Sequence, residues 1–213
     1  MKFQSMYEQK DPAQLAALQR RTRMGLLLVQ APDGGPRAGW TNASPAGPGF
    51  MVHLASDDPQ AAALRAGSGA TLLFSEVLST IPSHWVDPED GSRATNLYLA
   101  VEYRCAVQVL DTGPRAASAL ASMLIHYQPE GGHRSMDPED PLYAAKLKAL
   151  CVAHLNVVER RSKWKVGQVW SPEKRLEIME KLTKRGRPED LRSGEEMRRW
   201  FGDQAAGVKN PLQ

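Results

Sequence analysis

Apolar and polar residues alternate along the middle of the chain. From Asn96 to Leu110 every second residue is apolar, beginning at Leu97 and ending at Val109, and this period of two predicts a long strand with one buried face. A nearly unbroken apolar run from Leu150 to Glu159 predicts a second long strand, covered on both faces and prolonged after a kink by residues 163–169. Shorter strands are predicted at residues 24–30, 37–42, 50–54 and 70–77. The glycine- and proline-rich residues 33–36 and 45–49 are predicted as the connections between the first three of these short strands.

Helix starts are marked by a capping residue followed by proline. Asp11-Pro12, Asp58-Pro59 and Ser171-Pro172 each place a side-chain acceptor at the N-cap and a proline at the first helical position. Together with apolar spacing near 3.6 residues, these signals predict helices at residues 12–20, 59–65, 114–126, 142–149 and 172–182. Ser193 is interpreted as the cap of a last helix that reaches Trp200.

This order of elements favours an antiparallel barrel with peripheral helices, a mainly β fold of the α+β class. The strands gather early, so the alternation of strand and helix that builds a parallel doubly wound sheet is missing. We predict a barrel domain with inserted helices at residues 1–170, a C-terminal helical extension at 171–202, and a flexible tail at 203–213.

Composition supports one core and a weakly basic C-terminal part. The chain of 213 residues is 42% hydrophobic and carries a net charge of +3, enough apolar material for a substantial core. Between Glu159 and Trp200 there are 13 Lys and Arg residues against 8 Asp and Glu residues, which favours either a solvated helical face or contact with a phosphate backbone. No helix-turn-helix pattern, membrane-spanning run or signal peptide is found, so a cytoplasmic protein is expected.

The two cysteines do not indicate a disulfide or a metal site. Cys105 and Cys151 both lie in apolar segments, where buried, reduced and slowly reacting thiols are expected. The histidines have no zinc-ligand spacing, and the sequence contains no nucleophilic-serine, dinucleotide-binding or phosphate-loop motif. No catalytic residue is predicted.

Several short motifs resemble one family. His53-Leu54-Ala55 followed by Asp58-Pro59-Gln60 is similar to a segment of the PaiB-type FMN-binding regulators, which lie within the wider group of pyridoxamine-phosphate-oxidase-like split barrels. The resemblance continues, in the family's order, through residues 81–85, 95–98 and 161–168, and it covers about residues 6 to 200. It implies a split β-barrel that binds FMN at the interface of a homodimer and has a regulatory role.

The resemblance and the residue types together suggest a set of cofactor-binding residues. Lys163 and Lys165 alternate on a strand, so both ammonium groups could meet a phosphate or a flavin carbonyl, although lysines on a solvated strand edge are the other interpretation. Tyr98 could donate a hydroxyl hydrogen bond, although a tyrosine on such a strand is more often a core residue, and Trp85 fits a ring-covering residue or an anchor for its loop equally. The predicted cofactor-binding residues are His53, Ser56, Ser83, Trp85, Thr95, Tyr98, Lys163, Lys165 and Gln168.

Departures from the family pattern argue against tight FMN binding. Ser56 stands where the family has an arginine, and Asp57 and Asp58 place two carboxylates beside a helix start. Carboxylates there would compete with a phosphate for the free N–H groups and would repel it. The sequence therefore predicts weak FMN binding that Ser56→Arg together with Asp57→Ala would strengthen.

Three functions remain open from the sequence. The first is a flavin-binding dimer with a regulatory role, the second an FMN-dependent oxidoreductase, and the third a barrel that has lost flavin and acts as a binding module. A homodimer is expected on the premise that the apolar row from Leu97 to Val109 leaves a face for a partner.

Overall fold

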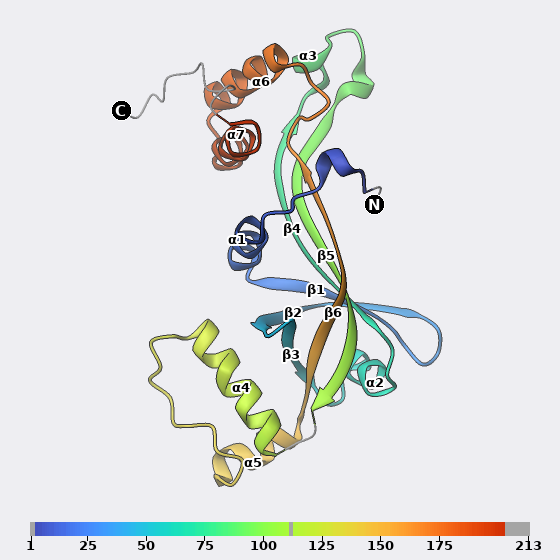
Figure 1. Ribbon diagram of the computed structural model, residues 1–213, viewed down its shortest axis with the longest axis vertical. Coiled ribbons are helices and arrows are strands. Elements are labelled where there is room, and N and C mark those ends of the chain that lie inside the picture. Colours follow the sequence, from blue (N-terminus) through green and yellow to red (C-terminus); the bar gives the residue numbers. More distant parts are fainter. Residues whose placement is uncertain (1–2, 111–112, 203–213) are drawn as a thin grey trace. The chain divides into compact units, whose positions relative to one another are not determined.

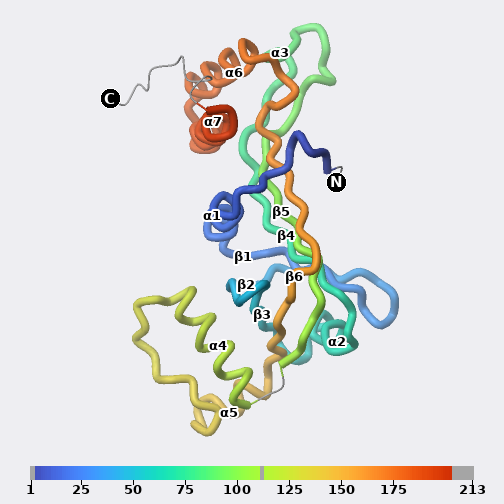
Figure 2. The backbone as a smooth tube through the Cα atoms, viewed as in Figure 1, coloured from blue at the N-terminus to red at the C-terminus, as the bar shows by residue number. Residues whose placement is uncertain are grey.

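The computed structural model describes residues 3–110 and 113–202, drawn as a ribbon in Figure 1 and as a backbone tube in Figure 2. Its strands close into a barrel in the order β1-β2-β3-β6-β5-β4, which confirms the predicted antiparallel α+β architecture. The elements along the chain are η1 (Ser5–Tyr7), α1 (Pro12–Thr22), β1 (Met24–Gln30), β2 (Pro36–Ala46), β3 (Gly49–Ala55), α2 (Pro59–Arg65), β4 (Ala70–Ile81), α3 (Ser83–Val86), η2 (Gly91–Arg93), β5 (Thr95–Leu110), α4 (Pro114–Tyr127), α5 (Pro141–Lys148), β6 (Leu150–Lys165), α6 (Pro172–Arg185) and α7 (Pro188–Phe201).

Internal contacts divide the chain into two compact units. The barrel unit contains residues 19–74 and 101–161, and the terminal unit contains described residues 3–18, 75–100 and 162–202. The predicted boundary between a domain at 1–170 and an extension at 171–202 stays a prediction. The predicted tail, 203–213, lies outside the described residues.

In the barrel unit, β1, β2 and β3 each pair with their neighbouring strands in antiparallel orientation. Leu26 of β1 lies opposite Trp40 of β2 and Leu73 of β4, and Phe50 of β3 lies opposite Leu155 of β6. A Cβ atom on Gly49 would come within 1.9 Å of the Leu155 carbonyl oxygen. Only glycine therefore allows the close approach of β3 to β6 at this point.

An aromatic cluster fills the barrel unit. The ring of Phe50 lies 5.7 Å from that of Phe74 and 4.9 Å from that of Tyr103, in tilted and edge-to-face arrangements that favour aromatic pairs. Tyr103 is 6% exposed, and its hydroxyl accepts a hydrogen bond of 2.6 Å from Gln19 Nε2. A second apolar cluster joins the buried face of α4, including Leu120 and Met123, to α5 and β6.

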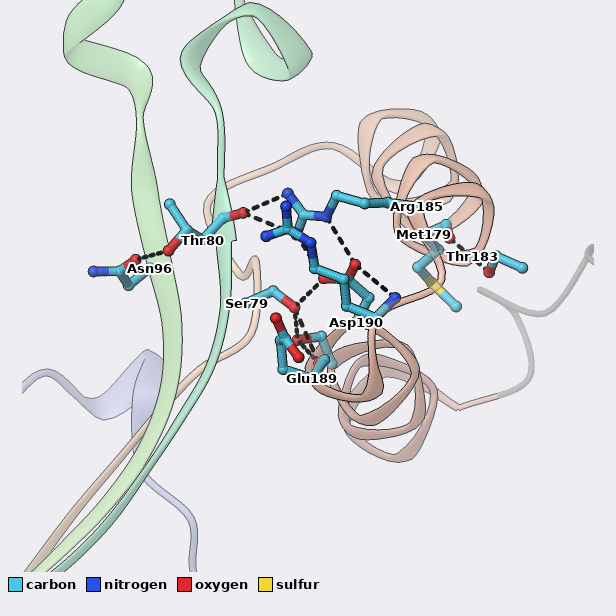
Figure 3. A network of polar contacts seen from close by, with 10 residues as sticks. Ser79, Thr80, Asn96, Met179, Thr183, Arg185, Glu189 and Asp190 are labelled. Atoms are coloured by element: carbon cyan, nitrogen blue, oxygen red, sulfur yellow. Dashed lines mark hydrogen bonds and ion pairs between the residues drawn. The ribbon is translucent and has the colours of Figure 1, made fainter.

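The terminal unit combines the ends of the long strands with the C-terminal helices. Its buried residues include Trp164 of β6, Ile178 and Leu182 of α6, and Met197 of α7. A polar network shown in Figure 3 connects α7 to β4, because Ser79 Oγ donates a hydrogen bond of 2.7 Å to Asp190. This network brings the last helix into the same packed unit as the strand.

Most predicted elements are confirmed, with corrections at several ends, among them that of β4, which continues to Ile81 instead of ending at Val77. Residues 43–46, of which 45 and 46 were predicted as part of a loop, pair with β3 and extend β2 to Ala46. The strand predicted to continue to Val169 ends at Lys165, and a turn follows. The last helix begins at Pro188 rather than after Ser193, because the proline and the acidic residues behind it form a better first turn.

The apolar row of β5 is confirmed as buried from Leu97 to Cys105, which offers no face to a partner, whereas Val107 and Val109 are half-buried. Leu97, Leu99, Val101, Tyr103 and Cys105 are each at most 6% exposed. They belong to the core of the fold, since an inward-facing row on a barrel strand is covered by the chain itself. The premise of the expected homodimer is therefore wrong for Leu97 to Cys105, while the dimer itself stays a prediction.

Candidate functional site

A pocket in the terminal unit brings several predicted residues together. It has a volume of about 270 Å³ and is lined in part by Tyr7, Arg93, Thr95, Lys165 and Trp170. These residues come from η1, η2, the first residue of β5, the end of β6 and the turn behind it. The pocket therefore depends on segments that are far apart in the sequence.

Two lysines and two tyrosines form a cationic and aromatic face beside this pocket. Lys163 and Lys165 alternate on β6, and Lys163 Nζ lies 5.0 Å from the centre of the Tyr7 ring and 5.8 Å from that of Tyr98. Lys165 Nζ lies 6.0 Å from the Tyr98 ring, within the range of cation–π contact. The ammonium of Lys165 also donates a hydrogen bond to Thr95 Oγ1. The structure thus brings four predicted residues together: Thr95, Tyr98, Lys163 and Lys165.

The electrostatics of Lys165 reflect this crowding. Burial, and then the neighbouring Lys163 ammonium, lower the pKa of Lys165 below its usual value of 10.5. Both effects disfavour the charged form, the first by removing water and the second by repulsion between like charges. An anion placed near the two ammonium groups would counteract both effects by stabilising the charged form.

Gln168 lines the same pocket, but its side-chain amide forms hydrogen bonds with the backbone. Its Nε2 donates a hydrogen bond of 2.6 Å to the Trp164 carbonyl oxygen, and its Oε1 accepts one of 3.0 Å from Val166 N. Behind it, Gly167 has a φ of +93°, and a Cβ atom there would lie 2.5 Å from the Trp170 ring. The side chain of Gln168 and the glycine therefore shape the turn that ends β6.

Trp85 and Ser83 lie on the short helix α3. The guanidinium carbon of Arg185 lies 4.7 Å from the centre of the Trp85 ring, and the Trp85 carbonyl oxygen accepts hydrogen bonds of 3.5 Å from Lys174 and Lys181. These contacts support the interpretation that Trp85 anchors its loop, here against α6. Of the residues of α3, Val86 is the one among the described residues that line the pocket.

His53 and Ser56 lie in the barrel unit, at the end of β3 and before α2. Burial lowers the pKa of His53 below its usual value of 6.5, and its Nδ1 is buried with no hydrogen-bond partner among the described residues. Ser56 accepts two hydrogen bonds from Arg65, one of 2.7 Å at Oγ and one of 2.8 Å at the carbonyl oxygen. Asp58 caps α2 by accepting a hydrogen bond of 2.7 Å from Gln60 N. The start of α2 is thus occupied by the chain's own side chains.

The two places differ in how well they fit a flavin mononucleotide. At α2 the Asp58 carboxylate already takes a backbone N–H group that a phosphate would need, so these residues do not fit the phosphate. In the terminal unit, two ammonium groups, the Arg93 guanidinium and the Thr95 hydroxyl offer donors of the kind that phosphate and carbonyl oxygens accept. This donor set fits FMN.

Sequence reasoning missed Tyr7 and Arg93 in the pocket and Arg65 at Ser56. Arg93 and Arg65 lie outside any motif, Tyr7 lies at the start of the stretch that resembles the family, and each contact depends on a distant segment or on a helix turn. No local signal in the sequence marks them.

Within residues 3–110 and 113–202, no three His, Cys, Asp or Glu side chains gather closely enough to hold a metal ion. Burial raises the pKa of Cys105 to about 11 and also raises that of Cys151. Both thiols are buried, as predicted. The described helices include none with the length and apolar character needed to cross a membrane.

Solved structures of other proteins share this fold. The flavocytochrome Anf3 of Azotobacter vinelandii superposes with a TM-score of 0.60 at 16% identity, covering 74% of this chain and 69% of that one. The FAD and heme binding protein of Mycobacterium smegmatis gives 0.58 at 13% identity, with coverage of 75% and 73%. A putative 5-nitroimidazole antibiotic resistance protein of Bacteroides thetaiotaomicron gives 0.57 at 12% identity, with coverage of 73% and 85%.

At these identities the likeness concerns the fold, which is the FMN-binding split barrel. No curated protein sequence matches the chain. One family model, described as "Putative FMN-binding domain", matches residues 1–181. The match spans the barrel strands, the cationic face and most of α6, and the chain therefore belongs to this FMN-binding domain family.

Proposed function

We propose that this protein is a cytoplasmic, PaiB-type flavin-binding regulator that holds FMN in its terminal unit. The single observation that carries the proposal is the face formed by Lys163, Lys165, Tyr98 and Thr95 in a chain of an FMN-binding family. The ammonium groups would bind anionic or carbonyl oxygens of the cofactor. The tyrosine rings would offer flat apolar surface to its ring system.

Bound FMN would supply redox chemistry that no protein side chain provides. The role of the chain's own residues is then to bind and orient. Thr95 holds the Lys165 ammonium in place through its hydroxyl, and Tyr7 and Tyr98 place the Lys163 ammonium over their rings. Gln168 keeps the adjoining turn in shape through two backbone hydrogen bonds.

The proposed assembly is a homodimer formed through the barrel unit. Trp40 on β2 is 61% exposed and lies opposite the half-buried Leu26 of β1, which in turn lies opposite Leu73 of β4. Directly opposite residues in a sheet share a face. This outer apolar row is the kind of surface that a second copy could cover.

Absorbance of the purified protein tests the flavin proposal. We expect the visible bands of oxidised flavin, either as purified or after incubation with FMN and removal of the excess. Lys163→Met should reduce flavin retention, whereas Lys184→Met, which removes an equal charge from an exposed position of α6, should not. A protein that stays colourless after incubation with FMN would contradict the proposal.

A second candidate is an FMN-dependent oxidoreductase, and the pocket beside the lysines favours it because a second small molecule could enter there. Adding a nicotinamide reductant to flavin-loaded protein without oxygen separates the two. An oxidoreductase should lose its flavin colour and then consume reductant continuously in air. A regulator should do neither at a comparable rate.

A further inference from the structure

Another pocket lies in the barrel unit, where the turn between β2 and β3 meets β5 and β6. Its volume is about 340 Å³, within the range of roughly 300–1,000 Å³ that is typical of small-molecule sites. The residues that line it include Gln19, Phe50, Tyr103, Val157 and Arg160. It shares no described lining residue with the pocket of the terminal unit, so it is separate from the cationic face described above.

One wall of this pocket is aromatic. Phe50 and Tyr103 both line it and are both buried, and their rings lie 4.9 Å apart in an edge-to-face arrangement. The ring of Phe74 supports that of Phe50 at a centroid distance of 5.7 Å. Because these rings hold one another in place, the wall is already formed before a ligand arrives, which lowers the entropic cost of binding. Aromatic rings favour a further ring as their neighbour.

The Tyr103 hydroxyl brings a hydrogen-bond donor to this aromatic wall. Its oxygen accepts a hydrogen bond of 2.6 Å from Gln19 Nε2, and among the residues that the structure describes none accepts its proton in turn. A hydroxyl can donate one hydrogen bond while it accepts another. Burial raises the pKa of Tyr103, and the positive charge of Arg160 acts against that rise. The guanidinium is therefore close enough to the hydroxyl for both to act on one ligand.

Arg160 has no carboxylate partner of its own. The neighbouring Glu159 pairs with Arg104 at 3.0 Å and with Arg161 at 3.3 Å. Within residues 3–110 and 113–202 the Arg160 guanidinium forms no ion pair, and none of the described residues that line the pocket is acidic. A guanidinium presents its N–H donors as a planar fork that matches the two oxygens of a carboxylate. The pocket thus combines one unpaired cation with an apolar wall.

We propose that this pocket is a binding site for a small aromatic monocarboxylate. Arg160 and the Tyr103 hydroxyl hold the carboxylate, and the ring of Phe50 contacts the aromatic body of the ligand. One cation balances one negative charge, so a monocarboxylate fits better than a phosphate dianion. The site lies outside the residues assigned to FMN and does not rest on the proposed flavin function.

Titration with benzoate tests the site, with the amide resonances of isotope-labelled protein as the readout. We expect saturable shifts at Gly49 and Val157, which line this pocket, and none at Ser122, which lines a different pocket of the barrel unit. Benzamide has the same ring without the charge and should bind about tenfold more weakly, because the charge-assisted hydrogen bonds are lost. Acetate has the charge without the ring and should also bind more weakly than benzoate.

Arg160→Met tests the cation. Because Arg160 is exposed, the variant should fold normally, and it should weaken benzoate binding by about fivefold or more while leaving benzamide binding unchanged. Lys148→Met is the matched control, since it removes an equal charge from an exposed position of α5 in the same unit. It should change the Kd for benzoate by less than about twofold, because distant exposed charges are screened.

Tyr103→Phe tests the hydroxyl. It keeps the aromatic wall and should weaken benzoate binding several-fold, with the unfolding temperature measured alongside to verify that the variant is folded. Absence of saturable benzoate binding to the wild type would overturn the proposal. Equal binding of benzoate and benzamide, or equal effects of Arg160→Met and Lys148→Met, would overturn it too. Shifts at Ser122 without shifts at Gly49 would place the ligand in the other pocket and have the same consequence.

Discussion

The guanidinium of Arg185 holds the carboxylate of Asp190 by two bonds, of 2.7 Å from Nε to Oδ2 and of 2.5 Å from Nη2 to Oδ1 (Figure 3). The Asp190 side chain is fully buried, and that of Arg185 is 19% exposed. Arg185 also donates to the Thr80 carbonyl oxygen of β4 at 3.1 Å. One planar side chain of α6 thus connects α7 and a strand of the terminal unit.

Asp190→Asn should destabilise the protein by about 3 kcal/mol, because it keeps the shape but leaves the partly buried Arg185 without its counter-charge. Chemical denaturation measures the free energy of unfolding. Glu195→Gln on the same helix, which breaks a pair whose glutamate is 57% exposed, is the control and should cost less than about 1 kcal/mol. Equal effects of the two changes would show that the buried pair has no special role.

The contribution of Asp190 should depend on pH. Burial alone would raise its pKa, but hydrogen bonds from Arg185 and Ser79 outweigh burial and hold the pKa of the Asp190 carboxyl below its usual value of 3.8. Because the pKa of Asp190 is lower in the folded than in the unfolded state, the carboxylate stabilises the folded state at pH values above its usual pKa. This stabilisation is lost as the pH falls through the pKa of the folded state. Denaturation from pH 7 to pH 3 should therefore show a constant difference between wild type and Asp190→Asn above about pH 5, and a shrinking one below. A difference that grows on acidification would contradict this assignment.

The double change Ser56→Arg and Asp57→Ala distinguishes two positions for the flavin phosphate. The sequence alone predicts tighter FMN binding, but in the structure Arg65 already brings a guanidinium to Ser56 and Asp58 caps α2. With the phosphate in the terminal unit, the double variant should change the Kd for FMN by less than about threefold. Titration of flavin fluorescence measures it. A tenfold gain would place the phosphate at α2 instead.

Trp40→Glu should dissociate the proposed dimer. Trp40 is 61% exposed on the outer row of the barrel unit, and a carboxylate at the centre of an apolar interface would be buried without a partner. Light scattering should give a dimeric mass for the wild type and a monomeric mass for the variant at micromolar concentration. Leu142→Glu, at a 45% exposed position of α5, is the control and should stay dimeric. A monomeric wild type would remove the dimer from the proposal.

Much of the fold follows from local sequence. The period of two in β5 predicted which residues are buried, and Leu97 to Cys105 confirm it. Residues 24–30 form β1 with the predicted bounds, and Pro12, Pro59 and Pro172 begin helices as predicted. These elements could be predicted because side-chain periodicity and capping act within a few residues of the chain.

Local patterns failed where a distant segment decides the role of a residue. Ser193 has the chemistry of a helix cap, yet it is buried inside α7 and its hydroxyl donates to Ser79 Oγ at 2.8 Å. Gln168 was predicted to lie on a strand, but the strand ends at Lys165 and the Gln168 amide donates to the Trp164 carbonyl oxygen, while its role in binding a cofactor stays a prediction. In both cases the hydrogen-bond partner, rather than the residue type, determines the function of the side chain.

The sequence by itself determined the strands, the helix starts, the buried rows and the alternation of Lys163 with Lys165 on one strand face. Only the tertiary structure decided that Tyr7 and Tyr98 contact these lysines, that Arg93 lines a pocket together with Lys165, and that the start of α2 is filled by Asp58 and Arg65. The physical reason is the separation along the chain over which each effect acts. Periodicity and capping depend on neighbours along the chain, whereas a binding site depends on which distant segments fold together.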